Sequence, residues 1–267
     1  MLINNEFIHV VDYSVSNPKA SVVLLHGIAE HHLRYQRLIE HLNENNYNVI
    51  AFDLRGHGKS GGKRGYIKNV NYYINDLKEV IIYTYRKYDN DVFIIGHSLG
   101  ALITNLYAID YDNVKGIIVS GSAGDFAKST NVLRVLPTFL YGFKKIKTNF
   151  QDPNLNGNTT NIYETNTDNY LLNEFSLKLI AETMIKGIRR LKKGMSKIKT
   201  PYLILHGESD KVIIPKSNNN LYLKIGSEDK HRITYPNFGH NILNDFNNEN
   251  IFKDIIRWLD KQYEKAS

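Results

Sequence analysis

The stretch Val92-Phe93-Ile94-Ile95-Gly96-His97-Ser98-Leu99-Gly100 joins a short apolar run to a longer one through a turn that contains a serine. The run before Gly96 predicts a buried strand, and residues 99–109 continue as an apolar helix. The turn itself matches G-x-S-x-G, and a strand, a tight turn and a helix are the setting in which such a serine becomes a nucleophile. We therefore predict that Ser98 is a nucleophile. A glycine- and serine-rich turn without chemistry is the alternative.

Outward from this stretch, short continuous apolar runs alternate with longer amphipathic segments. The runs that predict further strands are residues 22–25, 49–52, 117–119 and 202–205. The segments that predict helices are residues 33–45, 70–88, 217–225 and 251–263. Strands that are apolar throughout need cover on both faces, which is typical of a parallel sheet wrapped by helices. The sequence thus predicts an α/β fold with a mostly parallel central sheet, and the weakly alternating residues 2–13 predict an antiparallel edge hairpin.

One region interrupts this alternation. Between residues 121 and 200 there is no clean strand, yet the segment is too long for an ordinary loop. Residues 126–143 carry apolar side chains at helical spacing, and Pro137 should split that helix. Residues 152–161 should be irregular, and residues 171–191 should be helical again. We predict a core of residues 1–121 and 200–267, with a helical cap of residues 122–199 inserted after the sixth strand.

A serine nucleophile needs a base to take its proton and an acid to orient that base. In a fold of this kind the chain order is serine, acid, histidine. Asp210 follows the expected strand at residues 202–205, and His240 follows a short strand at residues 232–235. We predict Asp210 as the acid and His240 as the base, because His231 precedes its strand and should lie at the far end. The other carboxylates that remain open for the acid are Asp125, Glu208 and Asp229.

Acyl transfer also requires hydrogen-bond donors for the developing oxyanion, each worth about 3 kcal/mol. The backbone N–H of Leu99, directly after the nucleophile, is one expected donor. The backbone N–H of Ile28, in the loop after the strand at residues 22–25, is the other. The sequence therefore predicts an oxyanion hole made of main-chain amides.

The amino-acid composition excludes several classes of protein and of functional site. The chain has 267 residues, 42% of them hydrophobic, a formal net charge of +7 and no cysteine. The absence of cysteine excludes disulfide scaffolds, cysteine nucleophiles and thiolate metal sites. We expect no cofactor and no metal, because the serine mechanism needs neither. We also expect no nucleic-acid partner, because no nucleic-acid-binding motif accompanies the positive charge. No secretory signal or membrane-spanning run is visible, so we expect a cytoplasmic protein.

Together these motifs resemble the monoacylglycerol lipase and lysophospholipase group of the α/β-hydrolase superfamily. The resemblance rests on the serine turn, on the acid and histidine motifs, and on three further segments, namely His26-Gly27-Ile28-Ala29-Glu30-His31 with Arg34-Tyr35, Asp53-Leu54-Arg55-Gly56-His57-Gly58-Lys59-Ser60, and residues 62–66. It implies an α/β-hydrolase fold, catalytic roles for Ser98, Asp210 and His240, and oxyanion donors at Ile28 and Leu99. It also implies that Glu30 and Arg34 brace the active-site loops.

The cap could not be aligned with this family residue by residue, so the substrate is the least determined feature. Its apolar stripe is accounted for by packing on the core or by a hydrophobic acyl tunnel, for which Val132, Leu136, Phe139 and Leu140 are the pocket candidates. The cations that flank the stripe are Arg134, Lys144, Lys145 and Lys147, and they predict peripheral contact with an anionic membrane.

We expect a serine hydrolase that cleaves a small lipid ester, a monoacylglycerol or a lysophospholipid, through an acyl-enzyme on Ser98. A carboxylesterase or an aminopeptidase of the same fold acting on a non-lipid substrate is the alternative. A binding module without catalysis is a further alternative, and a complete set of serine, acid and histidine argues against it. A dehalogenase is disfavoured, since its nucleophile would be an aspartate at position 98. The oligomeric state is not predicted.

Overall fold

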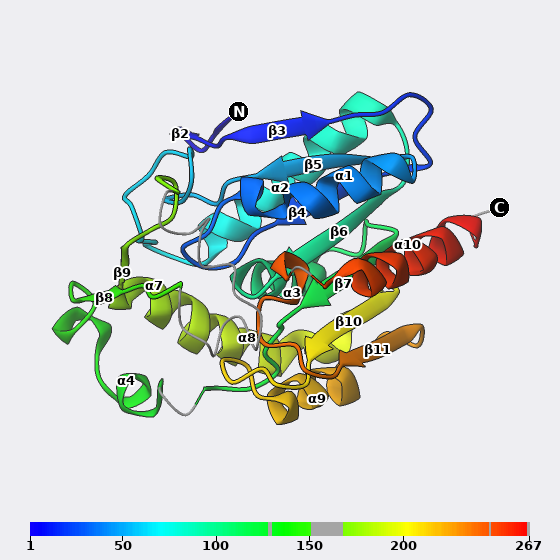
Figure 1. Cartoon of the computed structure of the whole chain (residues 1–267). Helices are drawn as coiled ribbons and strands as arrows, with labels where there is room; N and C mark the ends of the chain where they lie inside the picture. The colour runs from blue at the N-terminus through cyan, green and yellow to red at the C-terminus, as the bar shows by residue number, and fades with distance from the viewer. Residues whose placement is uncertain (128–129, 151–167, 246, 266–267) are drawn as a thin grey trace.

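The computed structural model describes residues 1–127, 130–150, 168–245 and 247–265. Its centre is a seven-stranded sheet with the order β11-β10-β7-β6-β4-β5-β3 (Figure 1). The strands are β3 (Val10–Tyr13), β4 (Ala20–Leu25), β5 (Tyr47–Phe52), β6 (Val92–His97), β7 (Gly116–Ser120), β10 (Tyr202–Gly207) and β11 (Lys230–Tyr235). All neighbours pair in parallel except β3, which runs antiparallel to β5 at the edge. The mostly parallel sheet is therefore confirmed.

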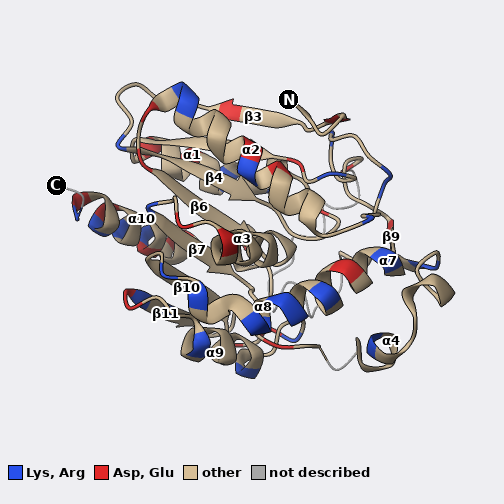
Figure 2. Cartoon of the chain, turned by 180° about the vertical axis from the view of Figure 1, so that it is seen from behind, with Lys and Arg blue, Asp and Glu red and all other residues tan. Residues whose placement is uncertain are grey.

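Helices cover both faces of this sheet. One face carries α1 (Gln36–Glu44) and α10 (Glu249–Glu264), and the other carries α2 (Asn71–Tyr88), α3 (Leu99–Asp110) and α9 (Pro215–Lys224) (Figures 1 and 2). Successive side chains of a strand point to opposite faces, so Val23 and Leu25 of β4 pack with α2 and α3, while Val22 and Leu24 pack with α1 and α10. Every residue of β4 to β7 and of β10 is buried, as the continuous apolar runs predict.

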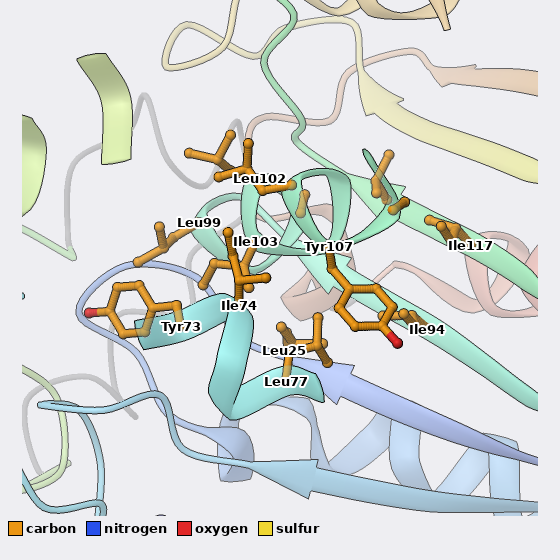
Figure 3. Packing of buried hydrophobic residues seen from close by; sticks show 14 of the residues in the cluster. Leu25, Tyr73, Ile74, Leu77, Ile94, Leu99, Leu102, Ile103, Tyr107 and Ile117 are labelled. Atoms are coloured by element: carbon orange, nitrogen blue, oxygen red, sulfur yellow. The ribbon is translucent and has the colours of Figure 1, made fainter. Parts of the chain in front are cut away.

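The apolar core between α2, α3 and the sheet packs against the helix that follows the turn at Ser98. Tyr73, Ile74 and Leu77 of α2 belong to one buried cluster with Leu99, Ile103 and Tyr107 of α3 (Figure 3). These side chains are almost fully buried, so the helix that begins directly after Ser98 is held by apolar contacts along its length.

The opening segment differs from its prediction. Residues Leu2–Ile3 (β1) and Glu6–Phe7 (β2) form a two-stranded ladder of their own, and β3 alone joins the large sheet. The cap consequently follows β7, the fifth strand of the central sheet in chain order, and not the sixth. The difference arises because the edge hairpin was expected to add two strands to the sheet, whereas it adds one.

The cap is built from short elements. In chain order these are α4 (Asn131–Val135), the 3₁₀ turn η3 (Thr138–Leu140), β8 (Lys145–Lys147), β9 (Glu174–Ser176), α7 (Leu177–Ile180), the π-helix η4 (Ala181–Gly187), α8 (Ile188–Gly194) and the 3₁₀ turn η5 (Met195–Lys197). The helix break at Pro137 is confirmed, because Pro137 is extended between α4 and η3. The antiparallel pair of β8 and β9 was not predicted. The segment at 152–161 lies outside the described residues.

The second helical stretch of the cap is anchored to the core. It begins at Leu177, six residues later than predicted, where the Ser176 hydroxyl accepts a hydrogen bond from the Leu179 N–H. A Cβ at Gly187 would lie 3.1 Å from Leu102 and one at Gly194 would lie 2.8 Å from Ile109, both on α3. The two glycines thus let this helix approach α3 closely, and we propose that residues 122–199 form a cap tied to the core by α8.

Candidate active site

Ser98 lies at the sharp turn between β6 and α3. Its φ is +50° and its ψ is −108°, a region that non-glycine residues rarely adopt. The Ser98 N–H donates to the Ser120 carbonyl of β7 at 2.9 Å, and the Ser98 carbonyl accepts from the Leu102 N–H at 3.1 Å. A Cβ at Gly96 would lie 2.7 Å from the Gly100 carbonyl oxygen, so the turn closes only with glycine there. This geometry holds Ser98 at the carboxyl edge of the sheet.

The structure brings Ser98, His240 and Asp210 together in a hydrogen-bonded chain. The Ser98 hydroxyl lies 2.9 Å from His240 Nε2, and His240 Nδ1 lies 2.8 Å from Asp210 Oδ2. Asp210 comes from the loop after β10 and His240 from the loop after β11, and both are buried. An Nδ1–H bonded to the carboxylate leaves Nε2 free to accept the serine proton, which is the arrangement that general-base catalysis requires.

Asp210 is held in place by the backbone as well as by the histidine. Its Oδ1 accepts hydrogen bonds from the N–H groups of Val212 and Ile213, each at 2.8 Å. Burial on its own would raise the pKa of Asp210, but the neighbouring His240 and the Ile213 amide outweigh burial and lower it. The carboxylate therefore stays ionised and can stabilise an imidazolium at His240.

The loop after β4 provides the surface next to the serine. Ala29 adopts a φ of +64°, and Glu30 turns back so that its Oε2 accepts from the Gly27 N–H at 2.9 Å and from the Tyr35 hydroxyl at 2.8 Å. The Arg34 Nε donates to the other carboxylate oxygen at 3.2 Å. Glu30 is thus a buried brace for this loop.

Burial alone would raise the pKa of Glu30, but Arg34, His97 and the Tyr35 hydroxyl lower it to about 2. The charged form is therefore the form that this loop requires at neutral pH.

Ile28, in the same loop, lines the cavity that contains Ser98. Neither the Ile28 N–H nor the Leu99 N–H has an acceptor among the described hydrogen bonds of turns and loops. We propose these two amides as the oxyanion donors.

The charged residues and the single histidine of the segment from Asp53 to Ser60 stabilise the loops, and no described hydrogen bond joins their side chains to Ser98. Asp53 Oδ1 accepts from both the backbone N–H and the Nδ1 of His32, at 2.9 and 2.7 Å, and Oδ2 accepts from the Lys59 N–H. Arg55 makes a two-pronged ion pair with buried Asp76. His57 is buried against the Arg55 carbonyl, so it has a scaffolding position.

One group of side chains in the described part of the chain has metal-ligand spacing. The ligand atoms of His9, His32 and Asp53 lie within 4.8 Å of one another. Both oxygens of Asp53 already accept hydrogen bonds, from His32 and Lys59. Through these hydrogen bonds Asp53 links the segment at His32 to the loop at Lys59.

The rival acids lie elsewhere. Asp125 pairs with Lys192, and Asp229 pairs with Lys265 and Gln262. Glu208 is exposed, and His231 is the second residue of β11, with its Nε2 at 3.1 Å from Asp229 Oδ1. Among the described residues, Asp210 is the carboxylate hydrogen-bonded to His240.

A cavity of about 300 Å³ opens above the triad. Its described lining consists of Gly27, Ile28, Ala29, Glu30, His97, Ser98, Lys147, Thr148, Asn149, Phe150, Phe175, Val212, His240 and Asn241. The expected pocket residues are not among them. Val132, Leu136, Phe139 and Leu140 are 67%, 43%, 79% and 51% exposed, because α4 and η3 bury none of their side chains. The pocket prediction is therefore wrong, and the cap lines the cavity with residues 147–150 and 175.

The chain is similar to known proteins in sequence and in fold. Residues 16–247 match the family described as serine aminopeptidase, S33. An uncharacterised abhydrolase domain-containing protein of Dictyostelium discoideum is 30% identical over 93% of the chain, which spans only 27% of that protein's length. A monoacylglycerol lipase of Mycolicibacterium smegmatis is 24% identical over 91% of the chain and 89% of its own. The crystal structure of Paleococcus ferrophilus monoacylglycerol lipase superimposes with a TM-score of 0.84, at 27% identity over 96% of this chain and 99% of that one.

The first prediction concerns Asp210→Asn. Because the Val212 and Ile213 amides demand an acceptor at Oδ1, the asparagine should place its NH₂ toward His240 Nδ1 and force the wrong histidine tautomer. We expect kcat on a soluble ester to fall about 10³-fold or more while the protein stays folded. Asp229→Asn is the matched control and should retain activity. Equal activity of the two variants would remove Asp210 from the mechanism.

The second prediction concerns Glu30 and acid stability. With its pKa lowered from 4.5 to about 2, the Glu30 carboxylate adds stability that is fully present above about pH 4.5 and is lost as the pH falls toward 2. Glu30→Gln should lower the free energy of unfolding by about 1–3 kcal/mol at pH 7, with the difference shrinking as the pH falls through this window. Urea denaturation from pH 7 to 3 measures it, with Glu44→Gln, an exposed carboxylate, as control. A difference that is constant with pH would contradict the assignment.

Proposed function

The chain belongs to the serine aminopeptidase S33 family of α/β-hydrolases, and we propose that it hydrolyses carboxylic esters of lipids, a monoacylglycerol or a lysophospholipid, through an acyl-enzyme on Ser98. The observation that carries the proposal is the hydrogen-bonded chain of Ser98, His240 and Asp210 at the base of a largely apolar cavity.

The geometry supports a two-step reaction. His240 Nε2 takes the hydroxyl proton as Ser98 Oγ attacks the ester carbonyl, and the Ile28 and Leu99 amides receive the oxyanion. His240 then gives that proton to the leaving alcohol, and the acyl group remains on Ser98. In the second step His240 Nε2 takes a proton from water as the water oxygen attacks the acyl carbonyl. His240 then gives this proton to Ser98 Oγ as the bond between Oγ and the carbonyl carbon breaks, which releases the acid and restores the serine hydroxyl.

A lipid ester fits the cavity better than a peptide. Ile28, Phe150, Phe175 and Val212 offer apolar surface for an acyl chain. An aminopeptidase needs an anion for the substrate ammonium, and the described lining has only Glu30, which is buried and bonded to Gly27, Tyr35 and Arg34. The other charge in the lining, Lys147, would repel an ammonium group. Relatives named monoacylglycerol lipase point the same way.

The third prediction tests this proposal by active-site labelling and substrate choice. A fluorophosphonate probe should label the wild-type protein and not Ser98→Ala, since the probe reacts with an activated serine. The wild type should hydrolyse monoacylglycerols with acyl chains of eight carbons or more faster than the matching two-carbon ester. No labelling of folded wild-type protein would refute the enzyme assignment. A preference for the two-carbon ester would favour the carboxylesterase alternative.

We further propose that the cap contacts an anionic membrane surface. Seven large apolar side chains are exposed in one short segment of the cap, namely Val132, Val135, Leu136, Phe139, Leu140, Phe143 and Ile146. The same segment carries Arg134, Lys144, Lys145 and Lys147 with no acidic residue between 131 and 147. Exposed apolar surface beside cations is the chemistry of an interfacial segment. None of the described helices combines the length and the apolar character needed to cross a bilayer.

The fourth prediction concerns Phe139, which is 79% exposed on η3. Phe139→Ser should weaken co-sedimentation with phosphatidylglycerol-containing vesicles several-fold and leave hydrolysis of a soluble short-chain ester unchanged, since the residue does not line the cavity. Phe7→Ser, a 51% exposed phenylalanine outside the cap, is the control and should bind like the wild type. Equal binding by both variants, or binding that ignores anionic lipid, would exclude this contact.

A further inference from the structure

One cation of the catalytic cavity has no protein counter-charge among the described residues. Lys147, on β8, lines the cavity together with Ser98 and His240. It pairs in register with Glu174 of β9, but the Glu174 carboxylate bonds to Lys145, two residues earlier on the same strand. The Lys147 side chain is exposed, and its ammonium group makes no described ion pair or hydrogen bond. Its ammonium group is therefore free to meet a ligand.

The other ionisable side chains of the lining do not neutralise Lys147. Glu30 is 3% exposed and its charge is engaged by Arg34. His97 is fully enclosed beside His240, and burial, with His240 next, lowers the pKa of its imidazole to about 4, so His97 is neutral at pH 7. Among the described residues, the cavity thus presents one unmatched positive charge, on β8 of the cap.

A second cavity indicates where the acyl chain of a substrate lies. It has a volume of about 330 Å³ and is lined mainly by apolar residues, among them Phe126, Met184, Ile188 and Ile213. Val212 lines both cavities, whereas Lys147 lines only the first. An acyl chain that extends from Ser98 past Val212 lies against the apolar lining of the second cavity. The alcohol part of the ester is then left with Lys147, Thr148 and Asn149.

We propose that Lys147 binds an anionic group on the alcohol of the substrate, so that the preferred substrate is a monoacyl ester of glycerol that carries a phosphate. This inference rests on the proposed lipid-ester hydrolysis and selects among its substrates. An ammonium on a flexible stem provides three donors to phosphate oxygens without demanding one geometry. The role of Lys147 is recognition, and the bonds made and broken remain those of the acyl-enzyme reaction.

The fifth prediction compares two substrates that differ only in that phosphate, 1-octanoylglycerol and 1-octanoylglycerol 3-phosphate. Both are used below their micellar concentrations, so that membrane contact by the cap plays no part. The measured quantity is the ratio of kcat/KM for the phosphate ester to kcat/KM for the neutral ester. Lys147→Met should lower this ratio about fivefold to tenfold through KM, as expected for loss of one charge-assisted contact at a partly exposed site.

Two control variants separate recognition from general charge. Lys147→Arg keeps the cation and should hold the ratio within about twofold of the wild type. Lys193→Met removes an exposed lysine on α8 that lines neither cavity, and should leave the ratio unchanged. The Lys147→Met effect should also shrink as salt is added.

The outcomes distinguish this inference from the proposed function. A ratio that is the same in Lys147→Met and wild type, with both octanoyl esters hydrolysed, overturns the role of Lys147 and leaves lipid-ester hydrolysis standing. An equal fall in Lys193→Met also overturns it, because the effect is then that of net charge. Hydrolysis of neither ester by folded wild-type protein overturns both proposals.

Discussion

The backbone of Ser98 is the constraint on which the site depends. A positive φ at a residue with a side chain is unfavourable by about 1–3 kcal/mol, and such a residue persists only where its surroundings fix it. Here the Ser98 N–H donates a hydrogen bond to the Ser120 carbonyl of β7, and the Ser98 carbonyl accepts one from the Leu102 N–H of α3. The helix α3 is packed along its length against α2. The buried parallel sheet and its helices therefore stabilise one strained residue at the edge where the acid and histidine loops also emerge.

Buried carboxylates organise the loops around that residue. Asp53, Asp76, Glu30 and Asp210 are each nearly inaccessible, and each accepts at least two hydrogen bonds or one two-pronged ion pair. A buried charge left without such partners would destabilise the fold by several kcal/mol, so each carboxylate specifies the positions of its donors. The loops after β4, β5 and β10 are thereby fixed relative to Ser98, although their apolar content is small.

Sequence patterns could predict the core and the triad because both depend on local order along the chain. Continuous apolar runs identify most of the parallel strands, and Ser98 and Asp210 each follow one of them. His240 follows the more polar strand β11, so the chain order of serine, acid and histidine is as expected. The cap gives no such signal. β8 and β9 are three residues each, and Lys147, Phe150 and Phe175 reach the cavity through tertiary placement that no period reveals. The apolar stripe at residues 132–140 is the pattern of a helix with one buried face. The structure nevertheless leaves these side chains exposed, since no described residue packs over them.

The loop after β10 connects the chemistry to the choice of substrate. Asp210 uses one carboxylate oxygen for His240 and the other for the amides of Val212 and Ile213. Val212 in turn lines both cavities, so the residue that an acyl chain must pass is positioned by the acid that orients the base. A change in the Asp210 carboxylate would therefore move the apolar wall as well as the imidazole. By contrast, Lys147 lies on β8 of the cap, and no described hydrogen bond or ion pair joins its side chain to Ser98, His240 or Asp210. Head-group recognition is thus separable from catalysis in this fold, whereas passage of the acyl chain is coupled to it.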